Sequence, residues 1–77
     1  MHVVLYTRRD PVCSFCENAK KLLTEKKISY TEYVIPDDIE LEAVKEAYPN
    51  AKKVPVVVIN GQWIGGYAEL QQMLGGG

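Results

Sequence analysis

The sequence predicts an α/β fold with a mixed four-stranded sheet, and three observations lead to that prediction. Short apolar runs rich in β-branched residues alternate with longer segments whose apolar residues recur at helical spacing. A helical segment between two strand-like runs is typical of the right-handed crossover that joins parallel strands. Near the C-terminus, Asn60-Gly61 separates two strand-like runs and is a strong hairpin signal, which adds an antiparallel pair. The predicted order is therefore β-α-β-α-β-β-α, with helices flanking both faces of the sheet.

The first half of the chain contains the predicted parallel strands and the helix that connects them. Residues 2–6 form an apolar run suited to a strand buried on both faces, and residues 7–12 are expected to form a loop. In that loop Pro11 biases Asp10 away from helical dihedral angles. A helix is expected from Cys13 or Ser14 to residue 27, and residues 28–35 are expected to form the second strand, which Pro36 ends.

The second half supplies the remaining helices and the hairpin. Asp37 or Asp38 is expected to cap a helix that runs to about residue 48. Residues 56–59 form the most apolar run in the chain and predict the third strand, and residues 62–64 predict the fourth. Residues 67–74 are expected to form a short last helix. The glycines at 75–77 are expected to be a helix stop with a frayed tail or an added tail, and we assign them no function.

Length, composition and charge exclude several classes of function. The 77 residues predict a single domain, residues 1–77, with an ordinary 47% of hydrophobic residues. A net charge of −1 provides neither the basic surface that binds nucleic acid nor a polybasic membrane patch. No apolar run approaches the roughly 18 residues of a membrane span, and no signal peptide pattern is visible. We therefore expect a soluble cytoplasmic monomer that binds neither nucleic acid nor membrane.

The only two cysteines, Cys13 and Cys16, lie three residues apart where the first strand leads into the first helix. Free N–H groups and the positive end of the helix dipole favour a thiolate there. Cys13 is therefore the candidate nucleophile, and Cys16 is the candidate resolving thiol. Lowering a thiol pKa by two units requires about 2.7 kcal/mol, whereas a helix N-terminus typically supplies about 0.3–1 kcal/mol. We expect N–H···S bonds and Arg8 or Arg9 to contribute the rest.

Three other interpretations of the cysteine pair compete with a redox role. A structural disulfide that closes so short a loop would stabilise the fold by only about 2 kcal/mol. A zinc site would lack ligands, because the chain has no second cysteine pair and only one histidine, His2. The two cysteines could also be unrelated buried thiols. A C-x-x-C beside a β-α-β pattern, in a chain without other cysteines, favours the redox role.

Four segments together resemble the glutaredoxin family, which has the thioredoxin fold. They are Tyr6-Thr7-Arg8, Cys13-Ser14-Phe15-Cys16, Val54-Pro55 and Ile64-Gly65-Gly66-Tyr67. They resemble the family's Tyr-Thr-Lys lead-in, its C-P-Y-C, its valine before a cis proline and its glycine pair before the last helix. The resemblance covers nearly the whole chain. It implies a glutathione-dependent thiol–disulfide oxidoreductase that reduces protein disulfides and protein–glutathione mixed disulfides without needing a metal.

The resemblance also implies a glutathione site. Val54, beside a cis Pro55, would offer its backbone to the cysteinyl unit, and Gly65 and Gly66 would leave a bare backbone for the γ-glutamyl carboxylate. Cationic side chains would bind the glycyl carboxylate, Phe15 would wall the site, and Glu69 would hold the γ-glutamyl amine. We expect Tyr6 and Trp63 to pack in the core or at an edge of the sheet. The full predicted set is Arg8, Arg9, Phe15, Lys53, Val54, Pro55, Gly65, Gly66, Tyr67 and Glu69.

Departures from the family pattern keep alternatives open. Ser14 stands where proline is usual, and serine there is also associated in the family with a [2Fe-2S] cluster held between two subunits by glutathione. The lead-in is about two residues longer than usual, so either Arg8 or Arg9 takes the place of the family's lysine. One alternative is an iron–sulfur carrier. The other is a thioredoxin-like electron donor, for example to ribonucleotide reductase, which a flavoprotein reductase would reduce.

Overall fold

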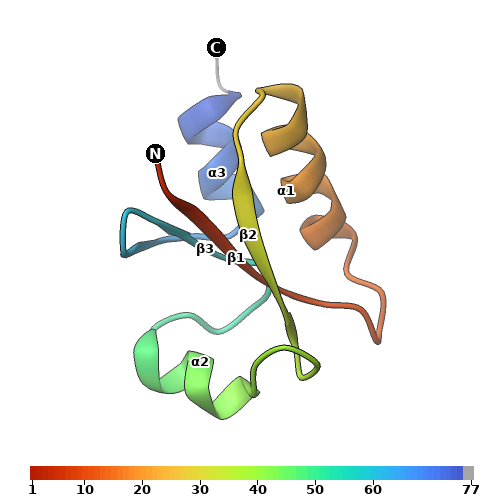
Figure 1. Cartoon of the computed structure of the whole chain (residues 1–77), viewed down its shortest axis with the longest axis vertical. Helices are drawn as coiled ribbons and strands as arrows, with labels where there is room; N and C mark the ends of the chain where they lie inside the picture. The colour runs from red at the N-terminus through yellow and green to blue at the C-terminus, as the bar shows by residue number, and fades with distance from the viewer. Residues whose placement is uncertain (76–77) are drawn as a thin grey trace.

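The computed structural model of the chain describes residues 1–75, whose elements follow the predicted order (Figure 1). They are β1 (Val3–Arg8), α1 (Ser14–Glu25), β2 (Tyr30–Ile35), α2 (Leu41–Ala47), β3 (Val56–Ile59), β4 (Gln62–Gly65) and α3 (Tyr67–Leu74). Gly75 is the C-cap of α3, as expected of a helix stop. The expectation for the tail at 76–77 falls outside the described residues. Over residues 1–75, no helix is both long enough and apolar enough to span a bilayer.

The four strands form one mixed sheet in the order β2-β1-β3-β4. The central strand β1 pairs parallel with β2, where Leu5 lies opposite Glu32, and antiparallel with β3, where Leu5 lies opposite Val57. β3 turns into β4 through Asn60 and Gly61, which both have positive φ, at 52° and 84°. This is the backbone that a tight hairpin of Asn-Gly sequence adopts. The predicted mixed sheet is confirmed.

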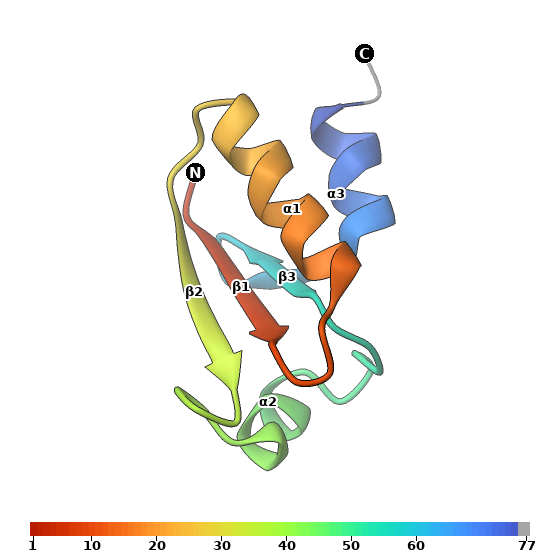
Figure 2. The same ribbon diagram turned by 90° about the vertical axis from the view of Figure 1, so that its right-hand side faces the viewer.

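Helices cover both faces of the sheet, as predicted. Figures 1 and 2 show α1 and α3 side by side over one face and α2 on the other side of the sheet. Neighbouring residues of a strand point to opposite faces, so β3 contributes to two separate cores. The core under α1 and α3 contains Val3, Leu5, Ala19, Leu23, Val57, Ile59 and Leu70, and the core against α2 contains Ile35, Val44, Val56 and Val58.

β1 is longer than predicted. A loop was expected from Thr7, but Thr7 and Arg8 continue the ladder and pair with Val34 and Ile35 of β2. Thr7 is only 1% exposed, and its hydroxyl donates a hydrogen bond of 2.7 Å to the carboxylate of Glu32. A buried hydroxyl needs such a partner, and this one keeps Thr7 inside the sheet. The longer strand carries Arg8 to the start of the loop that leads to Cys13.

The start of α2 was also predicted wrongly. Asp38 was one of two candidate caps, but its carboxylate accepts a hydrogen bond of 2.8 Å from the N–H of Val34. It therefore closes a turn after β2, and α2 begins at Leu41 with Glu40 as its N-cap. Asp37, the other candidate, lies in the same turn.

Smaller differences affect α1, β2 and β4. α1 ends at Glu25 rather than at residue 27, because Lys27 adopts a positive φ of 59° that cannot continue a helix. β2 accordingly begins at Tyr30, two residues later than expected, and β4 includes Gly65.

Candidate functional site

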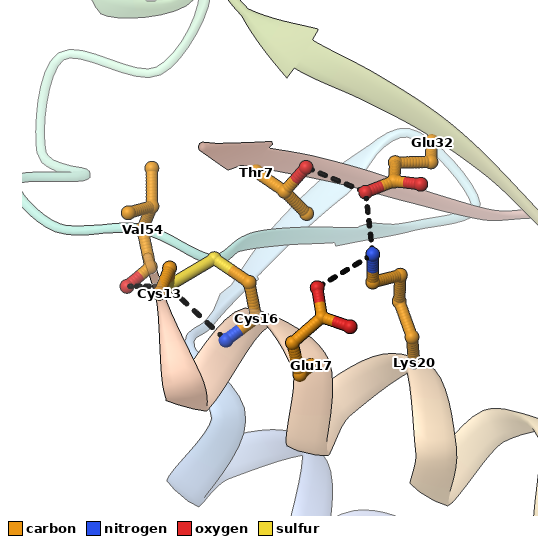
Figure 3. The surroundings of a disulfide bond; sticks show 7 residues. All are labelled: Thr7, Cys13, Cys16, Glu17, Lys20, Glu32 and Val54. Carbon is orange, nitrogen blue, oxygen red and sulfur yellow. Dashed lines mark hydrogen bonds and ion pairs between the residues drawn. A yellow bond between two sulfur atoms is a disulfide. The ribbon is translucent and has the colours of Figure 1, made fainter. Parts of the chain in front are cut away.

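The two cysteines lie at the N-terminus of α1, as predicted, and are joined by a disulfide (Figure 3). Cys13 is the N-cap residue, with φ −113° and ψ 99°, and its Sγ accepts a hydrogen bond of 3.1 Å from the N–H of Cys16. Cys16 is fully buried, whereas Cys13 is half-buried. A molecule that approaches from solvent therefore meets Cys13 and not Cys16.

The surroundings of Cys13 favour a thiolate once the disulfide is reduced. The N–H of Cys16 already points at this sulfur, and the positive end of the α1 dipole lies at the same position. Arg8 lines the same hollow as Cys13 and adds a cation. The helix dipole supplies only about 0.3–1 kcal/mol toward stabilising the thiolate. The N–H of Cys16 and the charge of Arg8 are the two further contributions that the sequence led us to expect.

The loop before β3 lies against the reactive sulfur. The carbonyl oxygen of Val54 is 4.0 Å from Cys13 Sγ, although the two residues are 41 positions apart in the chain. The Val54–Pro55 peptide is cis, as the resemblance predicts, and Pro55 is buried while Val54 is half-buried. Two other proline peptides, after Asp10 and after Ile35, are also cis.

Two hollows flank this loop. The larger one, of about 650 Å³, lies toward the start of α3, and we call it the α3 hollow. Its lining includes eight of the residues predicted for glutathione: Phe15, Lys53, Val54, Pro55, Gly65, Gly66, Tyr67 and Glu69. The smaller one, of about 480 Å³, contains Cys13 and Arg8 and reaches residues of α2, so we call it the α2 groove. The two share Phe15, Lys52, Lys53 and Val54.

The structure separates the two candidate arginines. Arg8 lines the α2 groove beside Cys13. Arg9 lines neither hollow, and its positive charge instead helps to lower the pKa of Glu32. Of the two, Arg8 therefore has the better position to meet an anion at Cys13.

The backbone of Gly65 and Gly66 at the start of α3 is already covered by the side chain of Glu69. Gly65 has a φ of 127°, and a Cβ at this position would lie 2.5 Å from Cγ of Glu69. The carboxylate of Glu69 accepts a hydrogen bond of 2.8 Å from the N–H of Gly66, the N-cap of α3. A bare backbone was expected for a ligand carboxylate, but a carboxylate of the chain itself already takes this N–H.

Aromatic side chains border the α3 hollow. Phe15 is 60% exposed and stacks on Tyr67, with ring centroids 6.2 Å apart. Trp63 lies on the edge strand β4, as expected, but it also lines the hollow, which the sequence interpretation missed. Tyr6 packs against the core on the α2 side and stacks on Tyr33, in line with its expected packing role.

A polar network next to the disulfide was also missed. Figure 3 shows Glu32 between Thr7 and Lys20, and Lys20 in turn between Glu32 and Glu17. The Nζ of Lys20 lies 3.1 Å from the Glu32 carboxylate and 2.8 Å from that of Glu17. One signal was available in the sequence: Lys20 is four residues after Cys16, and thus on the same face of α1.

The network shifts the pKa of both partners of the ion pair. Burial by itself would raise the pKa of Glu32, but the hydrogen bond from Thr7 and the charges of Lys20 and Arg9 bring it below its ordinary value. The hydrogen bond to Glu17, with the added attraction of Glu32, raises the pKa of Lys20 despite its partial burial. Both groups are therefore held in their charged forms. Among residues 1–75, no three His, Cys, Asp or Glu side chains are grouped to hold a metal ion.

Comparison with known protein families gives one match for most of the chain. Residues 3–64 match the family model of glutaredoxin. A hybrid peroxiredoxin of Haemophilus influenzae is 37% identical over 62 residues, which are 80% of this chain and 25% of that protein. The chain thus spans about a quarter of the length of this curated relative.

Solved structures match nearly the whole chain. Glutaredoxin 1 from Francisella tularensis, crystallised in complex with cacodylate, is 27% identical, with a TM-score of 0.74 over 92% of this chain and 88% of that one. A thioredoxin-like protein is 28% identical, with a TM-score of 0.70 over 94% of this chain and 99% of that one. These matches confirm the thioredoxin-like fold that the sequence predicts.

Proposed function

This chain belongs to the glutaredoxin family of redox proteins, and on that basis we propose that it is a glutathione-dependent thiol–disulfide oxidoreductase. Its substrates would be protein disulfides and protein–glutathione mixed disulfides. The observation that carries the proposal is the asymmetry of the two sulfurs. Cys13 caps α1 and faces the α2 groove, whereas Cys16 is buried behind it.

With a glutathionylated protein, Cys13 would act alone. Its thiolate attacks the glutathione sulfur of the mixed disulfide, a bond from Cys13 to glutathione forms, and the protein leaves as a thiolate that takes up a proton. A second glutathione, as its thiolate, then attacks the same glutathione sulfur. Glutathione disulfide leaves and the Cys13 thiolate is regenerated. The net change converts one free glutathione and the mixed disulfide into glutathione disulfide and a protein thiol.

With a protein disulfide, both cysteines would take part. Cys13 attacks one sulfur of the substrate and forms an intermolecular disulfide, which Cys16 then breaks by attacking the sulfur of Cys13. The substrate leaves with two thiols and the chain keeps the Cys13–Cys16 disulfide, the form that the structure contains. The hydrogen bond from the N–H of Cys16 to Cys13 Sγ supports this order, because it stabilises Cys13 as the attacking thiolate.

We place glutathione in the α3 hollow next to Cys13. Val54 would pair with the cysteinyl unit through its backbone, and the stacked rings of Phe15 and Tyr67 would wall the site. Lys53, which lines both hollows, and Arg8 are the cations available for the glycyl carboxylate. Pro55, Gly65 and Gly66 would contribute backbone surface, and Glu69 would attract the γ-glutamyl amine.

The test is the steady-state rate on a glutathionylated peptide, with glutathione, glutathione reductase and NADPH. We expect wild-type protein to be well above the uncatalysed rate. Cys13→Ser should fall to that background because no other exposed thiol remains, whereas Cys16→Ser should keep much of its deglutathionylation and lose the reduction of protein disulfides. Full activity of Cys13→Ser would overturn the assigned roles, and a wild-type rate equal to background would overturn the dependence on glutathione.

A second candidate function is electron donation with a flavoprotein reductase as the source, for example to ribonucleotide reductase. The similarity to a solved thioredoxin-like protein, at 28% identity, favours it. The sequence near the C-terminus favours glutathione instead. Electron donors to ribonucleotide reductase of glutaredoxin-like size carry a W-S-G-F-R-P segment there, whereas this chain has Trp63-Ile64-Gly65-Gly66-Tyr67. Turnover with thioredoxin reductase but not with glutathione would select the second candidate.

A further inference from the structure

Most of the residues that line the α2 groove are not among the proposed glutathione contacts. Its floor is formed by Ile35, Val44 and Val56, which are at most 6% exposed and belong to the core. Its lining also includes Leu41 and Val12, which are 44% and 83% exposed. Neither of these side chains is buried in the core, and exposed apolar surface gathered around a reactive cysteine is typical of an interaction surface.

The charged side chains that line the α2 groove are all basic. Within residues 1–75, no acidic side chain lines the groove. Four of the nine basic side chains of the chain do, namely Arg8, Lys45, Lys52 and Lys53. Glu42 and Glu46 of α2 are exposed but lie outside the lining. The whole chain has a net charge of −1, so this excess of cations is local. Such a groove raises the encounter rate with anionic partners and disfavours cationic ones.

The two hollows provide separate places for the two molecules that a mixed disulfide joins, glutathione and a polypeptide. They lie on either side of Val54 and Phe15, and Cys13 lines the α2 groove only. Glutathione in the α3 hollow would reach only Cys13 and Arg8 of the α2 groove besides the residues that both hollows share. It would leave the side of the groove around Leu41 and Lys45 free for the polypeptide that carries the other sulfur. Lys45 and Leu41 line this groove alone and belong to no proposed glutathione contact.

We infer that the α2 groove binds the polypeptide segment around the substrate cysteine, and that it selects segments in which acidic side chains accompany an apolar one. The apolar side chain packs against Leu41 and Val12, and the acidic side chains face Lys45 and Lys52. This inference rests on the proposed function and deepens it, because it names the class of protein substrate.

The test measures stoichiometric exchange without glutathione. The chain is reduced with dithiothreitol, desalted and mixed with one of three fluorogenic peptides, each with one intramolecular disulfide flanked by Asp-Leu, Ser-Leu or Lys-Leu. Each peptide disulfide gains two electrons and two protons and becomes a dithiol, while Cys13 and Cys16 lose them and form their disulfide. Rates are divided by the rate of each peptide with dithiothreitol, which removes differences in intrinsic reactivity.

We expect the Asp-Leu peptide to react about fivefold faster than the Lys-Leu peptide at low ionic strength, the size of one favourable surface ion pair. The difference should nearly vanish in 1 M salt, where the screening length is about 3 Å. Lys45→Glu should abolish or reverse the preference. Lys26→Glu makes the same change of charge at the far end of α1, outside both hollows, and should keep the preference.

The outcomes separate this inference from the proposed function. Equal rates for the three peptides at low salt, or equal effects of Lys45→Glu and Lys26→Glu, overturn the inference and leave the proposed function standing. A lack of exchange with all three peptides overturns the inference and, in the proposed function, the reduction of protein disulfides, while deglutathionylation is decided by its own assay. Thermal unfolding of the two lysine variants shows whether each is folded, and the Ser-Leu peptide reports on whether Cys13 still reacts in them.

Discussion

At the scale of single residues, Glu69 and Gly65 show how the start of α3 is built. The carboxylate of Glu69 accepts from the N–H of Gly66, one of the donors that the first turn of a helix leaves unpaired. To reach it, the side chain of Glu69 folds over the bare Cα of Gly65. Glycine at position 65 is therefore required twice, by its positive φ and by the space that Glu69 fills.

Gly65→Ala is expected to lower the free energy of unfolding by about 2–3 kcal/mol. The strained backbone accounts for about 1–2 kcal/mol, and loss of the Glu69 cap accounts for about 1 kcal/mol. Urea denaturation measures the change. The matched control is Gly61→Ala, since Gly61 also has a positive φ, of 84°, but a Cβ added there would meet no atom within 4 Å. Equal losses in the two variants would show that the contact with Glu69 contributes nothing.

The site residues divide into those that motifs reveal and those that only folding brings together. Cys13, Pro55 and Gly65 stand in recognisable short motifs, and the structure places Cys13 in the lining of the α2 groove and Pro55 and Gly65 in the lining of the α3 hollow. Trp63 and Lys45 carry no such signal, because each is one exposed side chain on an otherwise ordinary strand or helix. Their places at the hollows depend on how β4 and α2 pack, which no local pattern specifies.

At the scale of elements, local sequence predicted boundaries well only where local interactions decide them. β3 is a run of β-branched residues and α3 lies between Gly66 and Gly75, so both have the predicted bounds. The end of β1 depends instead on the bond from Thr7 to Glu32, 25 residues away. Asp38 was equally ambiguous, because the same carboxylate can cap a helix or close a turn.

The packing of α1 on the sheet predicts a large effect for one core residue. Leu23 has no exposed surface and packs with Leu5 and Leu70 in the core under α1 and α3. Leu23→Ala is expected to cost about 2–5 kcal/mol, through lost apolar burial and the cavity that remains. The measurement is the midpoint and slope of chemical denaturation.

Met73→Ala is the control for this variant. It also shortens an apolar side chain on a helix, but Met73 is 56% exposed, so its change should stay within about 0.5 kcal/mol. A loss for Met73→Ala as large as that for Leu23→Ala would contradict the division between core and surface.

At the scale of the whole molecule, one ion-pair network connects both strands of the parallel pair to α1. Thr7 of β1, Glu32 of β2 and Lys20 of α1 meet through side-chain bonds of 2.7 and 3.1 Å. Since the side chains of Lys20 and Glu32 are 19% and 21% exposed, water screens them only in part. The charge state of this network should therefore be visible in the stability of the fold.

Stability is expected to fall at both ends of the pH scale. The pKa of Glu32 is lowered by folding, so its contribution is present above pH 4.5 and is lost as the pH falls through the lower folded value. The pKa of Lys20 is raised, so its contribution is complete below pH 10.5 and is lost as the pH rises further. The pKa of Tyr6 is also raised, mainly by burial, and adds to the alkaline loss, so the acid side is the diagnostic one.

Thermal unfolding of wild type and Glu32→Gln between pH 2 and pH 7, at about 0.1 M salt, measures the acid loss. The variant should be less stable than wild type at pH 7, and the two should converge in acid. Glu25→Gln, at an exposed position of α1 that forms no salt bridge within residues 1–75, should follow the wild-type curve. Parallel curves for wild type and Glu32→Gln would show that the network does not titrate with folding.

The burial of Cys16 has a practical consequence for finding physiological targets. On the proposed function, a disulfide between the chain and a substrate protein is linked through Cys13, and Cys16 is the thiol of the chain that breaks it. A Cys16→Ser variant is consequently expected to retain substrate proteins as mixed disulfides with Cys13 when the cell extract has been freed of glutathione. Elution with dithiothreitol would then yield the captured proteins, and sequencing their cysteine-containing peptides would show which residues surround the captured thiol.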